Sequence, residues 1–472
     1  MKKWLFLSIV TFLLSSLIYS TEPNEQRSIT LNIEDAVAMA LNNNLGIKIE
    51  ELNVDRQKWD VWTSWNIFIP KTSMTAAFSR LNKDEDDREV SVLTPSVTSF
   101  NPMTGAFDEV SVTTAEIPEW GVGLSVDMSF ALNASMGFAV YQTVLDLQSG
   151  QLTLEEAKRK VERDTKKSFY QLLLLKENVE LMRQNLSAAE RRYLQAVELT
   201  RYGQMPRLNM LNAQVAFENL KPALIEMENG YASAMMGFKN MIGISRNTDL
   251  TLEGSLDICE ICIDRDEIRS LSESRRFDIL KLDQSIRSLE NLRNIHISGL
   301  TPTFILRFSA DPSFQKDPAT DDWFGDTDYM TDNWKQRSGM LMLGISMPID
   351  SWFPFSSAQM NIVETNYNIE RMRITREQIL RGNEIEVETI LMALEKSIRN
   401  MEALRLNVAI SEEAYKLSEE AYRTGGKDLV ELQGAELEYK KALNNLLREK
   451  YNFNVGLLDL EYIINQSIRK TN

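Results

Sequence analysis

Two cysteines and one histidine are the residues of this sequence best suited to metal or nucleophile chemistry. Cys259 and Cys262 form a Cys-x-x-Cys pair, and His296 is the single histidine. Four-coordinate zinc needs a second pair of ligands, and the acidic neighbours of the cysteines disfavour the thiolate that metal binding and redox chemistry require. We therefore predict a local disulfide or two free thiols, a packed or surface role for His296, no metal site and no cofactor.

Carboxylates dominate the remaining reactive groups. The chain of 472 residues has 68 Asp and Glu against 52 Lys and Arg, a formal net charge of -16. This balance argues against a nucleic-acid partner, because a phosphate backbone is bound by clustered cations. We find no nucleophile with a base and an orienting group, so the sequence predicts no catalytic residues and no enzyme. Hydrophobic residues make up 43% of the chain, which allows a sizeable core and excludes a disordered protein.

Residues 1–20 have the organisation of a secretory signal peptide. Lys2 and Lys3 precede an apolar run from Trp4 to Ile18, which Tyr19 and Ser20 follow. A membrane anchor is the alternative, but this run is shorter than the about 20 residues that a spanning helix needs. Beyond it the sequence has no long uninterrupted apolar stretch, so the mature chain could enter a membrane only as strands.

The two halves of the sequence read alike. Leu45 to Pro70 and Phe277 to Pro302 are equally long segments with helix-like spacing that end in proline and pass into strand-like sequence. We predict two structural repeats, 21–254 and 255–472, the second including a connecting segment. In each repeat a polar, acidic loop follows, at 82–119 and 311–337.

Each predicted repeat contains two segments that favour strands, at about 71–81 and 120–132 in the first and at about 303–310 and 339–349 in the second. In the last segment Leu343 and Ile345 alternate with Gly344 and Ser346. A membrane strand that faces lipid on one side and a lumen on the other has this period of two. A half-buried sheet in a soluble domain gives the same alternation, so both interpretations stay open.

Long helices are the stronger signal. Apolar residues in three segments recur at steps of three and four, which is typical of a coiled coil, with Glu436 and Lys450 as polar exceptions. The three series are Leu172, Leu175, Val179, Met182, Leu186, Ala189, Tyr193 and Ala196; Val387, Leu391, Leu394, Ile398 and Met401; and Leu429, Leu432, Tyr439, Leu443, Leu446, Phe453, Leu457, Leu460 and Ile464. A helix over 357–423 would be about 100 Å long, so we expect an extended bundle or tube of helices.

Glycines interrupt both helical pairs, near 203–206 and 424–428. Glycine ends a helix because it adopts the left-handed cap conformation at low cost, and proline suits the start of the next helix. Both segments are therefore predicted to be hairpin turns at the end remote from the strands. Aromatic residues cluster beside the predicted strands, either as a belt at a membrane interface or as ordinary helix packing: Trp59, Trp62, Trp65, Trp352, Phe353 and Phe355.

Four strands cannot close a membrane barrel, since an open edge in lipid leaves backbone groups unpaired. The barrel must then be shared between chains. Two chains would give eight strands and three would give twelve, and only the second leaves a useful lumen.

At this point the residues match a known family. The chain resembles TolC-type outer-membrane efflux proteins, from Leu31 to Ala36 and Ala40 to Asn44, which match the family's opening pattern, through to the final helix. Family hairpin turns read Gly, a hydroxyl residue three positions on, an acid six on and Leu eight on. Gly203 and Leu211 match this pattern, whereas Pro206 and Asn209 replace the hydroxyl and the acid. In the second turn, Gly425 reaches Leu432 in seven steps, one residue short.

The resemblance implies a mixed α and β membrane protein with an internal two-fold repeat. It implies a homotrimer with a 12-stranded barrel in the outer membrane of a diderm bacterium and a helical tunnel in the periplasm. Such proteins are exit ducts of tripartite efflux pumps or type I secretion systems. A periplasmic adaptor protein meets their hairpin tips, and an inner-membrane transporter is reached indirectly. The tip residues here would be Gly203, Gln204, Pro206, Gly425, Gly426 and Lys427.

If both turns converge on a threefold axis, inward-facing acids are repeated three times at the narrowest point and favour cations. The candidates for this aperture are Asp428 and Glu431, with Asn209, Asn212 and Gln433 as neutral counterparts. The alternative is that the carboxylates only stabilise a helix N-terminus.

A periplasmic coiled-coil adaptor or scaffold without a channel is the alternative function. An adaptor is expected to have one hairpin with flanking lipoyl-like or barrel modules, whereas this chain has two hairpins in register with two strand pairs. The sequence does not name the cargo.

Overall fold

The computed structural model describes residues 28–80, 89–93, 112–116, 120–258, 264–310, 313–315, 339–424 and 426–468. Residues 1–20, Cys259, Cys262 and Gly425 lie outside the described residues, as does most of the two acidic loops. The signal peptide, the state of the thiols and the contribution of Gly425 to the second turn therefore stay predictions.

The chain divides into two compact units. The hairpin unit comprises Met1–Val54, Gly150–Lys281 and Arg376–Asn472, and the sheet unit comprises Asp55–Ser149 and Leu282–Thr375. Each unit takes residues from both predicted repeats, so the compact units cut across the repeat boundary at 254.

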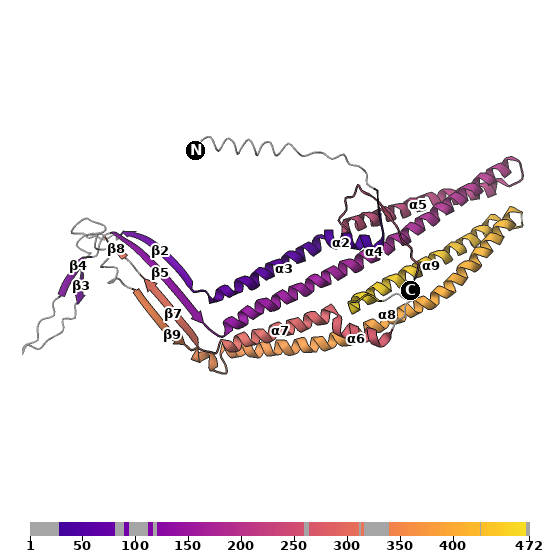
Figure 1. The fold of residues 1–472 in the computed structure, drawn as a ribbon. Coiled ribbons are helices and arrows are strands. Elements are labelled where there is room, and N and C mark those ends of the chain that lie inside the picture. The colour runs from indigo at the N-terminus through magenta and orange to yellow at the C-terminus, as the bar shows by residue number, and fades with distance from the viewer. Residues whose placement is uncertain are drawn as a thin grey trace, which may run out of the picture. The chain divides into compact units, whose positions relative to one another are not determined.

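The sheet unit contains an antiparallel sheet in the order β2 (Lys71–Arg80), β5 (Trp120–Leu132), β7 (Thr303–Ala310) and β9 (Gly339–Ser346), drawn in Figure 1. A short strand, β8 (Ser313–Gln315), also pairs with β5, while β3 (Glu89–Leu93) and β4 (Val112–Glu116) form a separate antiparallel pair.

Two strand predictions need correction. The strand predicted over 339–349 ends at Ser346, and a 3-10 helix, η6 (Ile349–Trp352), follows Pro348. Proline has no backbone N–H for the ladder, so it ends the strand. The segments predicted as loops, 82–119 and 311–337, contain β3, β4 and β8. The sequences of β3 and β4 are rich in Val and Thr, which favour strands.

Two helices lead into this sheet from corresponding positions in the two predicted repeats. α3 (Leu45–Ser64) continues through the 3-10 helix η2 (Trp65–Phe68) to β2, and α7 (Phe277–Ser298) leads to β7. α4 (Ser135–Arg201) packs against α7 through side-chain amides. Asn291 donates to the Phe138 carbonyl at 2.9 Å, and Gln284 donates to the Leu145 carbonyl at 2.8 Å. Both amides are buried, so these bonds fix how α4 and α7 sit within the sheet unit.

The hairpin unit has a first core around a small parallel sheet. β1 (Ser28–Leu31) pairs with β6 (Asp249–Leu252), and α2 (Ile33–Asn43) starts at Asn32, whose side chain accepts a bond from the Asp35 N–H at 2.7 Å. α5 (Arg207–Met241) and α4 complete this core. Its buried residues include Leu31, Ala36, Ala40, Phe169, Leu172, Met235, Phe238 and Leu252.

A second core joins α6 (Arg265–Arg275), α8 (Ser357–Arg423) and α9 (Leu429–Ile464). The helix predicted over 357–423 is confirmed as α8. The predicted series on α8 is wrong at one position, since Ile398 is exposed and Ser397 is buried. The Ser397 hydroxyl donates to Glu449 of α9 at 2.6 Å, which satisfies its burial.

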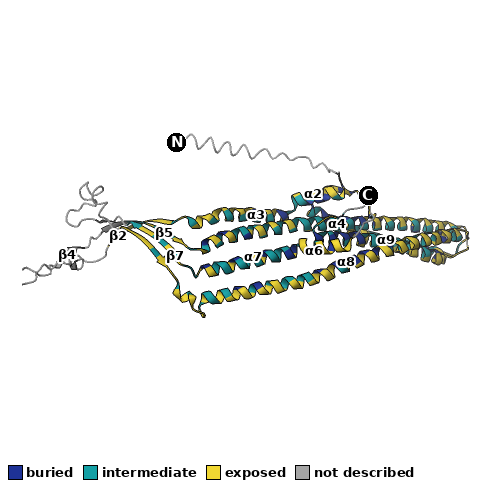
Figure 2. Ribbon diagram, turned by 60° about the horizontal axis from the view of Figure 1, so that its bottom comes forward, coloured by how far each residue is buried: buried dark blue, intermediate teal, exposed yellow. Residues whose placement is uncertain are grey.

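Burial is uneven along the elements. Figure 2 shows exposed residues along the strands and a mixture of buried and exposed residues on the long helices. Among the described residues, no helix is both long and apolar enough to span a bilayer.

Candidate functional site

Strand register gives the sheet two chemically different faces. Leu343 of β9 lies opposite Leu306 of β7, and Phe130 of β5 lies opposite Leu306 on its other side. Opposite residues of antiparallel strands share a face, so these three side chains belong to one surface. That surface, named the apolar face, comprises Thr72, Met74, Ala76, Phe78, Leu124, Val126, Met128, Phe130, Leu132, Phe304, Leu306, Phe308, Leu341, Leu343 and Ile345.

The apolar face is open in the single chain. Leu343 is 77% exposed and Phe78 is 65% exposed. Exposed apolar patches of this extent mark an interaction surface with protein or lipid. The half-buried soluble sheet is therefore disfavoured for this chain by itself, because no described element covers this face.

The opposite face, named the polar face, carries three of the four charged residues of these strands, whereas Arg80 at the end of β2 lies on the side of the apolar face. Asp127 lies opposite Ser73 and Ser309, and Arg307 lies opposite Ser129 and Met342. Asp127 and Arg307 are exposed. Lys71, Gly344 and Ser346 belong to this face by the same register. Sequence alternation in β9 indicated its two faces, but only the register of all four strands places Asp127 and Arg307 on one of them.

Both outer strands have one unused edge. Among the described strands, β2 pairs only with β5, and β9 pairs only with β7. An unpaired edge presents backbone N–H and C=O groups that can template another strand.

The predicted interface aromatics are all exposed. Trp59 and Trp62 contact each other edge to face with ring centroids 5.6 Å apart, and Trp352 donates from its indole nitrogen to the Leu300 carbonyl at 3.2 Å. Phe355 is 95% exposed. Exposure of this kind fits an interface belt better than ordinary packing within one chain, and the membrane role stays a prediction.

The first hairpin turn is closed by glycine. Gly203 has φ +70°, its N–H donates to the Thr200 carbonyl at 3.0 Å, and the Gln204 N–H donates to the Leu199 carbonyl at 2.8 Å. These are the two bonds of a glycine C-cap. Pro206 then occupies the N-cap of α5. Gln204 and Pro206 are exposed.

The second turn is closed by an aspartate. The Asp428 carboxylate accepts a hydrogen bond from the Glu431 N–H at 2.8 Å, and it caps α9. Gly426 and Lys427 are exposed, and Lys427 donates to the Ser418 hydroxyl at 3.1 Å. The capping role proposed for Asp428 from sequence is thus present.

The aperture candidates lie around these two turns. Asp428, Glu431, Asn209 and Asn212 are exposed, while Gln433 is half-buried. The two tips contact each other through a small buried cluster of Ala196, Ala213 and Leu429. This cluster brings the start of α5 and the start of α9 together within one chain, and the aperture role stays a prediction.

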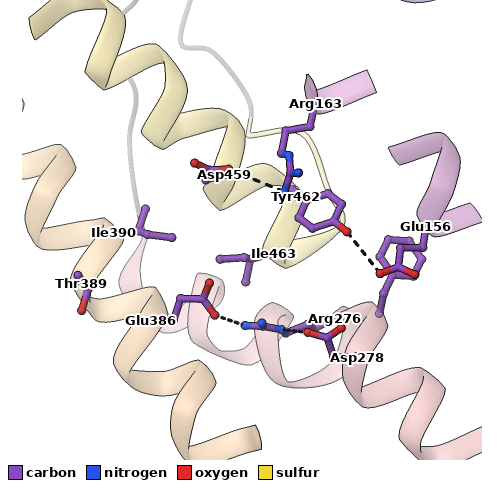
Figure 3. A pocket seen from close by; sticks show the side chains of 11 residues that line it. Glu156, Arg163, Arg276, Asp278, Glu386, Thr389, Ile390, Asp459, Tyr462 and Ile463 are labelled. Atoms are coloured by element: carbon purple, nitrogen blue, oxygen red, sulfur yellow. Dashed lines mark hydrogen bonds and ion pairs between the residues drawn. The ribbon is translucent and has the colours of Figure 1, made fainter. Parts of the chain in front are cut away.

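A cavity of about 440 Å³ lies in the hairpin unit where α4, α7, α8 and α9 meet, as drawn in Figure 3. Arg276 pairs with Asp278 at 3.0 Å and Glu386 at 2.6 Å, and Arg163 stacks on Tyr462 with 4.2 Å to the ring centroid. Burial raises the pKa of the Tyr462 phenol. The arginines that line the cavity are already paired, and the cavity lies at a junction of four helices.

Among the described residues, no group of three or more His, Cys, Asp and Glu side chains is arranged to hold a metal ion.

No protein-family model matches the sequence, and a search of curated proteins finds no match. Solved structures match in fold. The CmeC outer-membrane channel of Campylobacter jejuni has 14% identity and a TM-score of 0.73, with 96% of this chain and 91% of that chain covered. The MtrE outer-membrane channel of Neisseria gonorrhoeae, in its open state, has 15% identity and a TM-score of 0.69, with 95% and 94% covered.

The outer-membrane protein VceC of Vibrio cholerae has 11% identity and a TM-score of 0.68, with 93% of this chain and 97% of that chain covered. At these identities the likeness shows the fold. The chain has the fold of these outer-membrane proteins over nearly its whole length.

Proposed function

We propose that this chain is one of three identical subunits of a TolC-like exit channel in the outer membrane of a diderm bacterium. Its sheet unit forms part of a shared 12-stranded barrel, and its helical hairpins line a tunnel in the periplasm. The channel is a passive conduit of a tripartite efflux pump or a type I secretion system. The fold shared with outer-membrane channels supports this proposal.

The observation that carries the proposal is the amphipathic sheet with two unused edges. In lipid, an open edge leaves backbone groups without partners, so four strands alone are unstable there. Pairing β9 of one copy with β2 of the next satisfies both edges, and three copies give 12 strands. The apolar face then meets lipid and the polar face, with Asp127 and Arg307, lines the lumen.

Two exposed apolar series on helices support the same contact between neighbouring copies of the chain. α3 exposes Leu45 and Leu52, seven residues apart, and α8 exposes Met360, Tyr367 and Ile374 at the same interval. An interval of seven is the repeat of a coiled-coil seam. Because α3 leads into β2 and α8 follows β9, the chain connectivity carries each seam to one of the two unpaired edges, and α8 of one copy would pack against α3 of the next.

The remaining parts of the chain receive roles that rest on the trimer. The exposed aromatics form the periplasmic-side belt of the barrel, and the hairpin tips contact a periplasmic adaptor protein. The inner-membrane transporter is reached only through that assembly. The acids at the second turn, Asp428 and Glu431, face the narrow end of the tunnel. The matched order of helix and strand, α3 to β2 and α7 to β7, supports an internal two-fold repeat.

The test is native mass measurement of detergent-extracted protein, followed by recording in planar bilayers. Three copies per particle and discrete conductance steps support the channel. A monomer or dimer without conductance contradicts it and favours a coiled-coil adaptor or scaffold. Heat-modifiable migration in a gel gives an independent check, because a folded barrel resists detergent until it is heated.

A further inference from the structure

Glu436 interrupts the apolar series of α9 where the pattern calls for an apolar residue. Its side chain is only 8% exposed and pairs with Arg192 of α4 at 2.5 Å and with Lys440 of α9. Arg192 is 15% exposed and Lys440 is 25% exposed. A carboxylate is thus buried between two cations at a seam between the first and the second hairpin.

A tyrosine pair of the second hairpin lies near this group. Tyr415 of α8 stacks on Tyr439 of α9, with ring centroids 5.9 Å apart and an interplanar angle of 5°. Burial raises the pKa of Tyr415, and the negative charges of Glu436 and Glu419 add to that effect. The ion cluster therefore lies near an aromatic stack between α8 and α9.

α4 and α9 run antiparallel, with other polar contacts along their length. Asn178 contacts Asn444 at 3.0 Å, and Lys167 contacts Asp459 at 2.5 Å. These groups are half-buried, so they can exchange their partner for water if the helices slip. Glu436 has little access to water and would lose Arg192, with only Lys440 of its own helix left as a partner.

A slip by one heptad would place Glu436 beside Asn185 or Leu199 of α4 instead of Arg192. Arg192 would then face Leu429 or Leu443. The apolar series of α4 and of α9 both step by three and four residues, so a slip by one heptad brings equivalent positions of the two patterns opposite each other. It separates Arg192 from Glu436, so Arg192, which is 15% exposed, loses its carboxylate and Glu436 keeps only Lys440 of its own helix; separating the members of a buried ion pair is unfavourable. The heptad pattern alone therefore does not distinguish these registers, whereas the ion cluster does.

We propose that the Arg192–Glu436–Lys440 cluster sets the axial register of the second hairpin against the first. Glu436 is a positioning residue that selects one alignment of α4 and α9 at a cost in stability. This role goes beyond the channel function, since it concerns one chain by itself and holds whether or not the chain forms a channel.

The test measures a distance and a stability separately. Spin labels are placed at Leu194 of α4 and Leu437 of α9, which are exposed, in full-length protein with Cys259→Ser and Cys262→Ser. Labelled chains are diluted with unlabelled chains so that only distances within one chain are recorded. The variant of interest carries Arg192→Leu, Glu436→Leu and Lys440→Leu.

We expect the apolar variant to have the same thermal midpoint as the parent or a higher one. The distribution of distances between its two spin labels is expected to become broad or to show more than one maximum. A single distance equal to that of the parent would overturn the proposal, because packing alone would then fix the register. The matched control is Glu412→Gln, which removes the partner of Lys416 in an exposed pair on α8. It is expected to change neither readout.

If the apolar variant does not fold, variants with reversed charges test the positioning role of Glu436. Glu436→Arg alone is expected to lose the single distance, and adding Arg192→Glu and Lys440→Glu is expected to restore it. Retention of the distance by Glu436→Arg, or failure of the reversed cluster to restore it, rejects the positioning role.

Discussion

Arginine at Leu343 gives the sharpest test of the two faces of the sheet. The side chain is 77% exposed and belongs to the apolar face. If the face meets lipid, arginine near the middle of the bilayer costs about 2–4 kcal/mol. At about 1.4 kcal/mol per tenfold change, the equilibrium between folded and unfolded protein shifts roughly 30- to 700-fold toward the unfolded side.

The neighbouring glycine provides the matched control. Gly344 differs in depth by only about 3.4 Å, lies on the polar face, and would carry a Cβ with no atom within 4 Å. Gly344→Arg is therefore expected to change stability by no more than about 0.5 kcal/mol. The position also lies opposite Ile305, so no like charge stands directly across from it.

The assay is urea unfolding in lipid vesicles, with the folded fraction read from heat-modifiable migration. The midpoint of Leu343→Arg is expected well below that of the parent, and the midpoint of Gly344→Arg close to it. Equal shifts for the two variants would refute the lipid-facing assignment, because depth is matched and only the face differs. Insertion of both variants must be confirmed first by protease protection.

Three further outcomes follow from the turns and the buried carboxylate. Gly203→Ala is expected to lower the free energy of unfolding by about 1–2 kcal/mol, because φ is positive at this position. Gly434→Ala is expected to raise it by about 0.5–1 kcal/mol, because Gly434 lies inside a helix with free space where a Cβ would stand. Thermal unfolding of both variants checks this, and equal effects would contradict it. Asp428→Asn is expected to keep the cap of α9, because Asn and Asp cap helices equally well. Reduced cation selectivity in planar bilayers for Asp428→Asn or Glu431→Gln would therefore show an effect of the carboxylate charge on conduction. Unchanged selectivity in the double variant would leave only the capping role. Burial opposes ionisation of Glu436, but Arg192 and Lys440 outweigh burial and lower the pKa of Glu436 below the usual 4.5. The stabilisation that the ionised carboxylate gives is thus present above pH 4.5 and is lost as the pH falls through the lowered pKa. Glu436→Gln is expected to make stability depend less on pH in this acidic range, as measured by unfolding at a series of pH values.

Periodicity was sufficient for the long helices and for the two faces of one strand. The steps of three and four indicated the long helices, and α8 spans the predicted residues. The period of two in β9 separated Leu343 from Gly344. Both are properties of consecutive residues, which a sequence displays directly.

Relations between distant residues were not accessible in the same way. The pairing of Arg192 with Glu436 cannot be predicted from the sequence, because it depends on the register of two helices. Asp127 and Arg307 acquire a common face only when β5 and β7 are aligned. The exposed Ile398 and buried Ser397 show the same limit, since a hydroxyl becomes an acceptable core group only once Glu449 is placed beside it.

The interleaving of the two compact units has a kinetic consequence. The hairpin unit is assembled from three segments of the chain, and the last of them begins at Arg376. Its parallel pair β1–β6 joins residues 28–31 with 249–252, and its second core needs α9, which ends at Ile464. Contacts of such high sequence separation make folding slow, and exposed apolar surface before completion promotes aggregation. The hairpin unit thus completes its second core only after α9 has been synthesised, and until then a holding chaperone has more to protect than it would in a protein whose domains follow one another along the chain.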